Sequence, residues 1–295
     1  MTDKRLLISF SGGETSALMS KLLVERARDQ YDEIQCVFAN TGQENEQTLE
    51  FVDRCDKAFN LGVVWIESIT PPERGIGARA KVVNFASASR DGQPFEDMIR
   101  KHGIPGPSQP KCSDELKGRP IRRWAREHGW LPRTYDLAIG IRTDEIDRMS
   151  PAAKKNRVIY PLVSRFPHTK AMVNEFWSRQ PFRLPLKGYQ GNCKWCWKKS
   201  TRKLLTILSE TPEAFDFPER MEALYPHNGP GTTGEVRRFF RGNRTVQDLR
   251  DLMAQGFEPA TDDARTYQLD LTDWLDMDAD ACGSGSCEVS FGVDA

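Results

Sequence analysis

The chain has 295 residues, enough to bury a substantial core in one large domain or in a domain with an appendage. Lysine plus arginine and aspartate plus glutamate each number 42, so the net charge is zero and requires neither a nucleic acid nor an anionic membrane as partner. The start of the chain lacks the pattern of a signal peptide, and no apolar stretch approaches the roughly 20 residues of a membrane helix. We therefore expect a cytoplasmic protein with no membrane contact.

Apolar runs alternate with helical patterns in the first half of the chain. Residues 5–10 form an apolar run that stops at Ser-Gly-Gly, and residues 15–28 then have apolar side chains at helical spacing. The other elements expected here are strands at 33–39, 61–66 and 135–141 and helices at 46–59 and 116–128. This alternation predicts an α/β, Rossmann-like layered parallel sheet with helices on both faces. Ligands of such sheets bind at the carboxyl ends of the strands.

Regularity is weaker in the rest of the chain. Residues 71–111 are rich in Gly, Pro and Ser, and we expect them to form a long excursion that covers the site. After an apolar run at 158–163, helices are expected at 169–178, 200–208 and 212–224. We divide the chain into a main domain, 1–210, and a mostly helical or irregular extension, 211–295, whose acidic tail is expected to be mobile.

The segment SFSGGETSA has the features of a phosphate-binding loop. Its glycines let backbone amides approach an anion without a Cβ in the way, and Ser11, Thr15 and Ser16 add hydroxyl donors. The following helix would point its N-terminal amides and positive dipole end at the same place. A loop that holds a triphosphate should leave Gly12 and Gly13 open to solvent. The alternative is an ordinary glycine turn before a helix.

Four segments in order resemble the phosphoadenosine phosphosulfate reductase branch of the PP-loop ATP-pyrophosphatase superfamily. SGGETS is similar to the SGGxDS loop, and FANTG is similar to the F-A-D/N-T-G segment on the next strand. KCSDELKGRP and GIRTDEIDR are similar to two later motifs, so the resemblance covers residues 5–210. Thr15 replaces the usual aspartate of the loop. A Mg²⁺ role at that position is therefore in question, and Glu14, Asp144 or Glu145 could serve instead.

The resemblance implies an adenine nucleotide site for ATP and Mg²⁺. The residues implied to contact the phosphates are Ser11, Gly12, Gly13, Thr15 and Ser16. Those implied to border adenosine or the transferred group are Asn40, Thr41 and Gly42. The cations implied to neutralise phosphate or sulfate oxyanions are Lys117, Arg119, Arg142 and Arg148. The candidates for catalysis in this region are Lys117, Arg142, Asp144 and Glu145. Solvated cations and a simple loop ion pair are the alternatives.

Three of the seven cysteines have a spacing that favours a metal. The cytosol keeps thiols reduced, so a metal or redox role is considered before disulfides. Cys193 and Cys196 form a CxxC pair, and Cys112 can supply a third ligand. The pattern resembles the iron–sulfur sites of adenylylsulfate reductases and of tRNA thiolation enzymes, although the lone Cys112 departs from the Cys-Cys form of the former. We expect a 4Fe-4S cluster, with zinc or free thiols as alternatives.

The remaining cysteines divide into two pairs. Cys36 lies in an expected strand and Cys55 in an expected helix, where both are simply explained as buried small hydrophobes. Cys282 and Cys287 lie in the acidic tail. By position, Cys287 resembles the C-terminal catalytic cysteine of sulfonucleotide reductases. A resolving thiol pair, a fourth cluster ligand and an inert tail are the interpretations left open.

Three functions are compatible with these features. The first is an ATP-dependent sulfur-transfer or adenylating enzyme with a sulfur donor and a tRNA or DNA acceptor, which the intact SGG loop favours. The second is a sulfonucleotide reductase that uses a tail thiolate and a thioredoxin-like reductant. The third is a non-catalytic accessory protein whose arginine clusters follow a nucleic-acid backbone. A homodimer is compatible with each.

Overall fold

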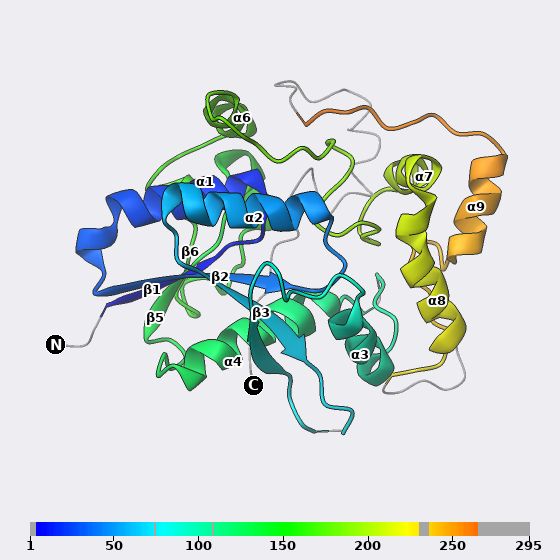
Figure 1. Ribbon diagram of the computed structural model, residues 1–295, viewed down its shortest axis with the longest axis horizontal. Helices are drawn as coiled ribbons and strands as arrows, with labels where there is room; N and C mark the ends of the chain where they lie inside the picture. The colour runs from blue at the N-terminus through cyan, green and yellow to red at the C-terminus, as the bar shows by residue number, and fades with distance from the viewer. Residues whose placement is uncertain (1–3, 74, 108, 230–235, 265–295) are drawn as a thin grey trace.

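A mostly parallel six-stranded sheet forms the centre of the computed structural model, which describes residues 4–73, 75–107, 109–229 and 236–264 (Figure 1). The strands are β1 (Arg5–Ser9), β2 (Glu33–Asn40), β3 (Val63–Ile69), β4 (Arg79–Val83), β5 (Tyr135–Ala138) and β6 (Val158–Ile159). Their order is β4-β3-β2-β1-β5-β6, and all neighbours are parallel except β3 and β4. The predicted α/β fold is confirmed, with the correction that the edge strand β4 is antiparallel.

Helices cover both faces of the sheet. The helices are α1 (Glu14–Arg26), α2 (Glu46–Phe59), α3 (Gln93–His102), α4 (Arg119–Glu127), α5 (Pro161–Ser164), α6 (Lys170–Ser178), α7 (Thr201–Glu210), α8 (Asp216–Leu224) and α9 (Val246–Ala254). Because side chains alternate along a strand, Leu6 and Ile8 pack with α1, α2 and α6, whereas Leu7 packs with α4 on the other face. Cys36 and Cys55 are fully buried in the first of these clusters, and burial raises the pKa of the Cys36 thiol to about 12. Their predicted role as buried hydrophobes is confirmed.

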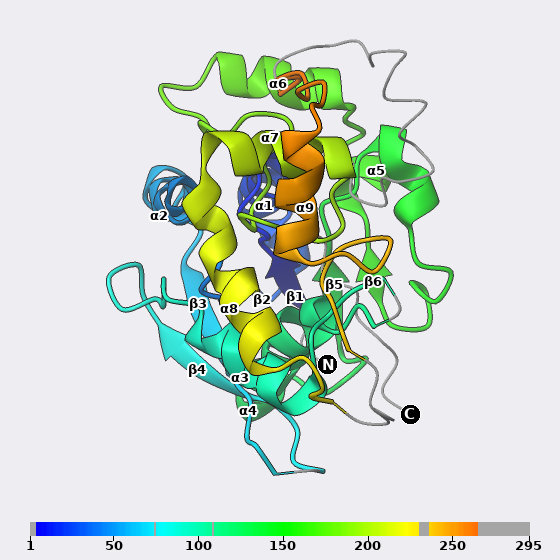
Figure 2. The same cartoon turned by 90° about the vertical axis from the view of Figure 1, so that its right-hand side faces the viewer.

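A helical layer lies beyond the carboxyl ends of the strands, where α7, α8 and α9 stand together (Figures 1 and 2). These helices and α3 share one apolar cluster, which contains Phe95, Trp195, Leu204, Phe217 and Leu249. The cluster thus contains residues from both sides of position 210. It closes the end of the sheet at which a ligand of a parallel α/β fold binds.

Two segments differ from the sequence-based expectation. Residues 71–111 are more than an excursion, since they contain β4 and α3. The α3 pattern is short, but Phe95, Met98 and Ile99 lie on one helical face and are buried. The run 158–163 is divided at Pro161, which lacks an N–H group, so that β6 ends and α5 begins there. The helix α9 was also not predicted.

None of the helices in the described ranges is long and apolar enough to cross a bilayer.

A change of direction in the sheet order positions the candidate site. The chain leaves β1 toward β2 on one side, while β5 pairs with the other side of β1. The loops after β1 and β5 therefore border a crevice at the carboxyl end of the sheet, the usual ligand position in open α/β sheets. The loops approach closely, because a Cβ on Gly140 would lie 3.1 Å from the Cα of Ser16.

Glu222 in the helical layer makes folding stability depend on pH. Burial raises the pKa of Glu222 to about 7. The hydrogen bonds that Glu222 accepts from the Val246 and Phe239 backbone N–H groups lower the pKa, but their effect is smaller than that of burial. A carboxyl whose folded pKa exceeds its unfolded pKa contributes stability at low pH and loses it as pH rises through 7. We expect Glu222 to lower the free energy of unfolding by on the order of 2 kcal/mol between pH 5 and pH 8. Urea titrations should show this pH-dependent loss in the wild type and a smaller loss in Glu222→Gln. Parallel pH profiles would contradict it.

Candidate nucleotide-binding site

The glycine loop between β1 and α1 is held in shape by its own hydroxyl groups. Ser16 Oγ accepts from the Ser11 N–H at 3.2 Å, donates to the Gly13 carbonyl at 3.0 Å and lies 2.9 Å from Ser11 Oγ. Gly13 is the N-cap of α1 and has no side chain to accept from the helix amides. The first turn of α1 thus provides the positive end of a helix dipole at the predicted phosphate position.

Both glycines of this loop are buried, which corrects the expectation that they face solvent. Gly12 has φ +88°, and a Cβ on it would lie 2.7 Å from Thr48 Cγ2 of α2. On another side, Asn192 Nδ2 donates to the Ser11 carbonyl at 2.6 Å. The glycines therefore shape and pack the loop. An anion can meet the loop on the side of Glu14 and Thr15, where both residues line a cavity.

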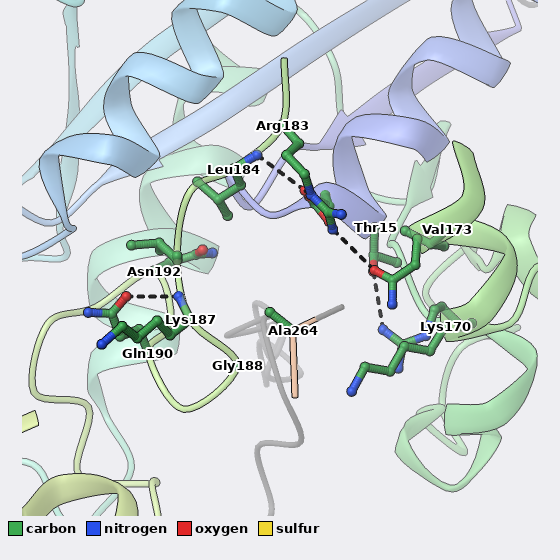
Figure 3. A pocket seen from close by; sticks show the side chains of 15 residues that line it. Thr15, Lys170, Val173, Arg183, Leu184, Lys187, Gly188, Gln190, Asn192 and Ala264 are labelled. Carbon is green, nitrogen blue, oxygen red and sulfur yellow. Dashed lines mark hydrogen bonds and ion pairs between the residues drawn. The ribbon is translucent and has the colours of Figure 1, made fainter. Parts of the chain in front are cut away.

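This cavity has a volume of about 80 Å³ and lies between α1, the β5 loop, α6 and residues 183–192 (Figure 3). Four cations are among its lining residues: Arg142, Lys170, Arg183 and Lys187. Glu14 carries the opposite charge and accepts two hydrogen bonds from Arg183, at 2.9 and 2.8 Å. Cations outnumber carboxylates among the lining residues, and each of the four is paired with a carboxylate, namely Asp144, Asp263, Glu14 and Glu210 in the order given.

Arg142 joins the glycine loop to the loop after β5. The guanidinium of Arg142 is buried and donates to Thr15 Oγ1 at 3.2 Å and to Asp144 Oδ1 at 3.0 Å. It also lies 3.2 Å from Glu145 Oε1, which Arg148 contacts too. The loop after β5 thus brings together four predicted residues, Arg142, Asp144, Glu145 and Arg148. Asp144 also accepts from the Lys170 N–H at the start of α6, at 3.2 Å.

The loop after β2 contains a buried ion pair that includes one predicted cation. Glu44 accepts from the Thr41 N–H at 2.9 Å, and Lys117 Nζ lies 3.5 Å from Glu44 Oε1. Asn40 donates to Glu67 at 2.7 Å, and its own side-chain carbonyl accepts from the Gly42 N–H at 3.2 Å. The predicted residues Asn40, Thr41 and Gly42 therefore shape this loop. They are not among the described residues that line the cavity.

The CxxC segment is fastened to the same loop. The Asn45 N–H donates to the Asn192 carbonyl at 2.9 Å, and the Lys194 N–H donates to the Gln43 carbonyl at 3.0 Å. Trp195 Nε1 adds a hydrogen bond of 2.7 Å to Gln43 Oε1. The cysteine segment and the glycine loop are consequently parts of one arrangement at the carboxyl end of the sheet.

The three predicted metal ligands lie in this part of the molecule. Cys112 and Cys193 both pack against the helical-layer cluster, and Cys196 is buried. In the ranges that the structure describes, no three Cys, His, Asp or Glu side chains are placed to hold one metal ion. The 4Fe-4S cluster and zinc remain predictions.

One other predicted cation, Arg119, is not among the residues that line the cavity. Arg119 is 40% exposed at its side chain and pairs with Asp114 at 2.8 Å. Cys287 falls outside the described residues. Conversely, the sequence patterns did not indicate that Lys170, Arg183, Asn174 and Asn192 line the cavity. Only Asn192 has a local signal, since it immediately precedes the CxxC pair.

Two buried asparagines line the cavity with polar atoms that lack a hydrogen-bond partner. Asn192 is 1% exposed and Asn174 is 5% exposed. Asn192 donates to a carbonyl through Nδ2, which leaves Oδ1 as its unpaired acceptor. Asn174 accepts from Arg183 through Oδ1, which leaves Nδ2 as its unpaired donor. Unpaired buried polar atoms are costly, so a ligand or water that satisfies them is favoured.

A glycine loop at the switch point of a mostly parallel sheet, beside a cationic cavity, defines a Rossmann-like α/β protein of the nucleotide-binding class. Residues 5–145 match the family model of the phosphoadenosine phosphosulfate reductase domain, a family that belongs to the PP-loop ATP-pyrophosphatase superfamily. The chain is also 28% identical over 299 residues to the uncharacterized nin region protein ORF290 of Escherichia phage lambda, covering 97% of this chain and 95% of the relative.

Proposed function

We propose that this protein is an ATP-dependent adenylating or sulfur-transfer enzyme of the phosphoadenosine phosphosulfate reductase-like family. The main support is the contact between Arg142 and Thr15, which brings a buried cation to the start of α1. Phosphate oxygens near Thr15 would meet the helix dipole and this guanidinium together. The four cations among the lining residues support the same assignment.

In the proposed reaction, an acceptor oxygen attacks the α-phosphorus of ATP, the bond to the β-phosphate oxygen breaks, and pyrophosphate leaves. A sulfur nucleophile from a donor then attacks the acceptor carbon, and the activated oxygen leaves with AMP. The chain's contribution is positioning and stabilisation of negative charge by the α1 amides, Arg142 and Lys170. Mg²⁺ bound with ATP would neutralise further charge, and Glu14, Asp144 and Glu145 are its candidate ligands. A tRNA or DNA acceptor remains part of the proposal.

The reaction is tested with ATP labelled at the α-phosphate and with sulfide as the sulfur donor, incubated with total tRNA, with DNA or with neither. Formation of labelled AMP and of pyrophosphate supports the proposed function. Release of sulfite from a sulfonucleotide in the presence of thioredoxin would replace it by the reductase. A protein that gives neither product, at several protein concentrations, is a non-catalytic binding protein.

Replacement of Arg142 by methionine is expected to weaken ATP binding by about 10- to 100-fold, because a charge-assisted hydrogen bond to phosphate is lost. The matched control is Arg179→Met, which removes the same charge from the exposed end of α6. Isothermal titration calorimetry measures both affinities. Equal affinities in the two variants would remove Arg142 from the nucleotide site.

A further inference from the structure

Two aspartates near the end of the described chain lie at the cavity. The Gly188 N–H donates to Asp262 Oδ1 at 2.9 Å, and Lys170 Nζ lies 3.1 Å from Asp263 Oδ2. The next residue, Ala264, lines the cavity, and Figure 3 shows it between Gly188 and Lys170. The chain thus brings two carboxylates to a wall of the cavity that carries donors.

This wall is shaped for a close approach of an oxyanion. A Cβ on Gly188 would lie 1.7 Å from Asp263 Oδ1, so the carboxylate fits only because residue 188 is a glycine. A backbone amide and a lysine ammonium together form the usual donor set for a carboxylate or phosphate group. The unpaired donor Nδ2 of buried Asn174 lines the same cavity.

The size of the cavity indicates that the aspartate segment takes up space that a ligand would use. The cavity of about 80 Å³ is well below the roughly 300–1,000 Å³ of small-molecule sites. Ala264 lines the cavity, and Asp262 and Asp263 contact the lining residues Gly188 and Lys170. An anion that binds the Gly188 amide and Lys170 must therefore displace these two carboxylates.

We propose that Lys170 and the Gly188 amide form an oxyanion subsite for a ligand, and that Asp262 and Asp263 occupy this subsite when the ligand is absent. The proposal rests on the proposed function, since it concerns the same cavity. The ligand group is a phosphate or a carboxylate. The aspartates compete with this ligand group for the subsite. The affinity measured for an anion is therefore the intrinsic affinity multiplied by the fraction of molecules in which the subsite is open.

The test compares Asp262→Asn/Asp263→Asn with the wild type. Calorimetry with inorganic pyrophosphate and, separately, with succinate should show binding about tenfold tighter in the variant for at least one probe. The matched control is Asp251→Asn/Glu258→Gln, which changes net charge equally at two exposed positions outside the cavity. Its affinities should equal those of the wild type. Adding Lys170→Met to the first variant should abolish the gain.

Each outcome decides the proposal. Tighter binding of pyrophosphate assigns the subsite to a phosphate group, and tighter binding of succinate assigns it to a carboxylate. If neither probe binds the Asp262→Asn/Asp263→Asn variant more tightly than the control variant, the proposed subsite does not exist. This conclusion holds even if ATP binds and the proposed function stands. If ATP does not bind but the gain for a probe is present, the subsite stands and the proposed function fails. Thermal melts of all variants verify that they are folded.

Discussion

Replacing Lys117 by methionine is expected to lower the free energy of unfolding by about 3–5 kcal/mol, because it leaves the Glu44 carboxylate buried without its cation. The two charged atoms are 3.5 Å apart, and the side chains of Lys117 and Glu44 are 8% and 0% exposed. Glu44 also accepts hydrogen bonds from the Thr41 N–H and hydroxyl, but these neutral donors cannot neutralise a full charge. Urea denaturation measures the loss.

The double variant Lys117→Met/Glu44→Gln isolates the charge effect. A neutral glutamine can still accept from Thr41, so most of the stability lost in the single variant should return. A loss below about 1 kcal/mol in Lys117→Met, or no recovery in the double variant, would contradict a buried ion pair at this loop.

Gly12→Val is expected to remove detectable ATP binding, a loss of more than about 100-fold, and to lower stability. The backbone at Gly12 has φ +88°, and a Cβ there would lie 2.7 Å from Thr48 Cγ2, so the loop or α2 must move. A movement of the loop displaces the start of α1 and its Thr15 from Arg142.

The matched control is Gly62→Val. Gly62 also has positive φ, at +62°, but a Cβ there has no other atom within 4 Å. It therefore carries the backbone strain without the steric clash and should leave ATP affinity unchanged. Calorimetry with thermal melts separates binding from folding. A folded Gly12→Val protein with wild-type affinity would exclude the glycine loop from the site.

The loops of the site were predictable because their signals are local. The glycines and hydroxyls of the first loop lie within six consecutive residues, and Ser16 closes that loop through hydrogen bonds to Ser11 and Gly13. Asn40 likewise accepts from the amide of Gly42, two residues on. Such short-range patterns follow from backbone geometry that few residue types allow.

The remaining wall of the cavity was not predictable, because it depends on contacts between distant segments. Asn192 reaches the Ser11 carbonyl across 181 residues of chain, and Arg183 reaches Glu14 across 169. No periodicity or turn signal encodes such pairs. The same reason explains the error about Gly12, whose neighbours Thr48, Phe38 and Val52 come from other elements of the fold.

The missed helices show a limit of a different kind. The pattern of α3 is only ten residues long and lies between Gly92 and Gly103, so its glycine and proline surroundings predicted a loop. Its helical form is favoured by packing of Phe95, Met98 and Ile99 in the helical layer. Tertiary packing rather than local propensity provides most of the stability of a helix this short.

Amide hydrogen exchange with and without ATP is the most direct test of the nucleotide site. We expect bound ATP to slow exchange at residues 11–16 and 142–148, and to leave α9 unchanged. A separate cavity is lined by Ile69, Arg79 and Arg100, among others. Slowed exchange confined to that cavity would place the nucleotide there. That result, or no change at saturating ATP, would contradict a nucleotide site at the glycine loop.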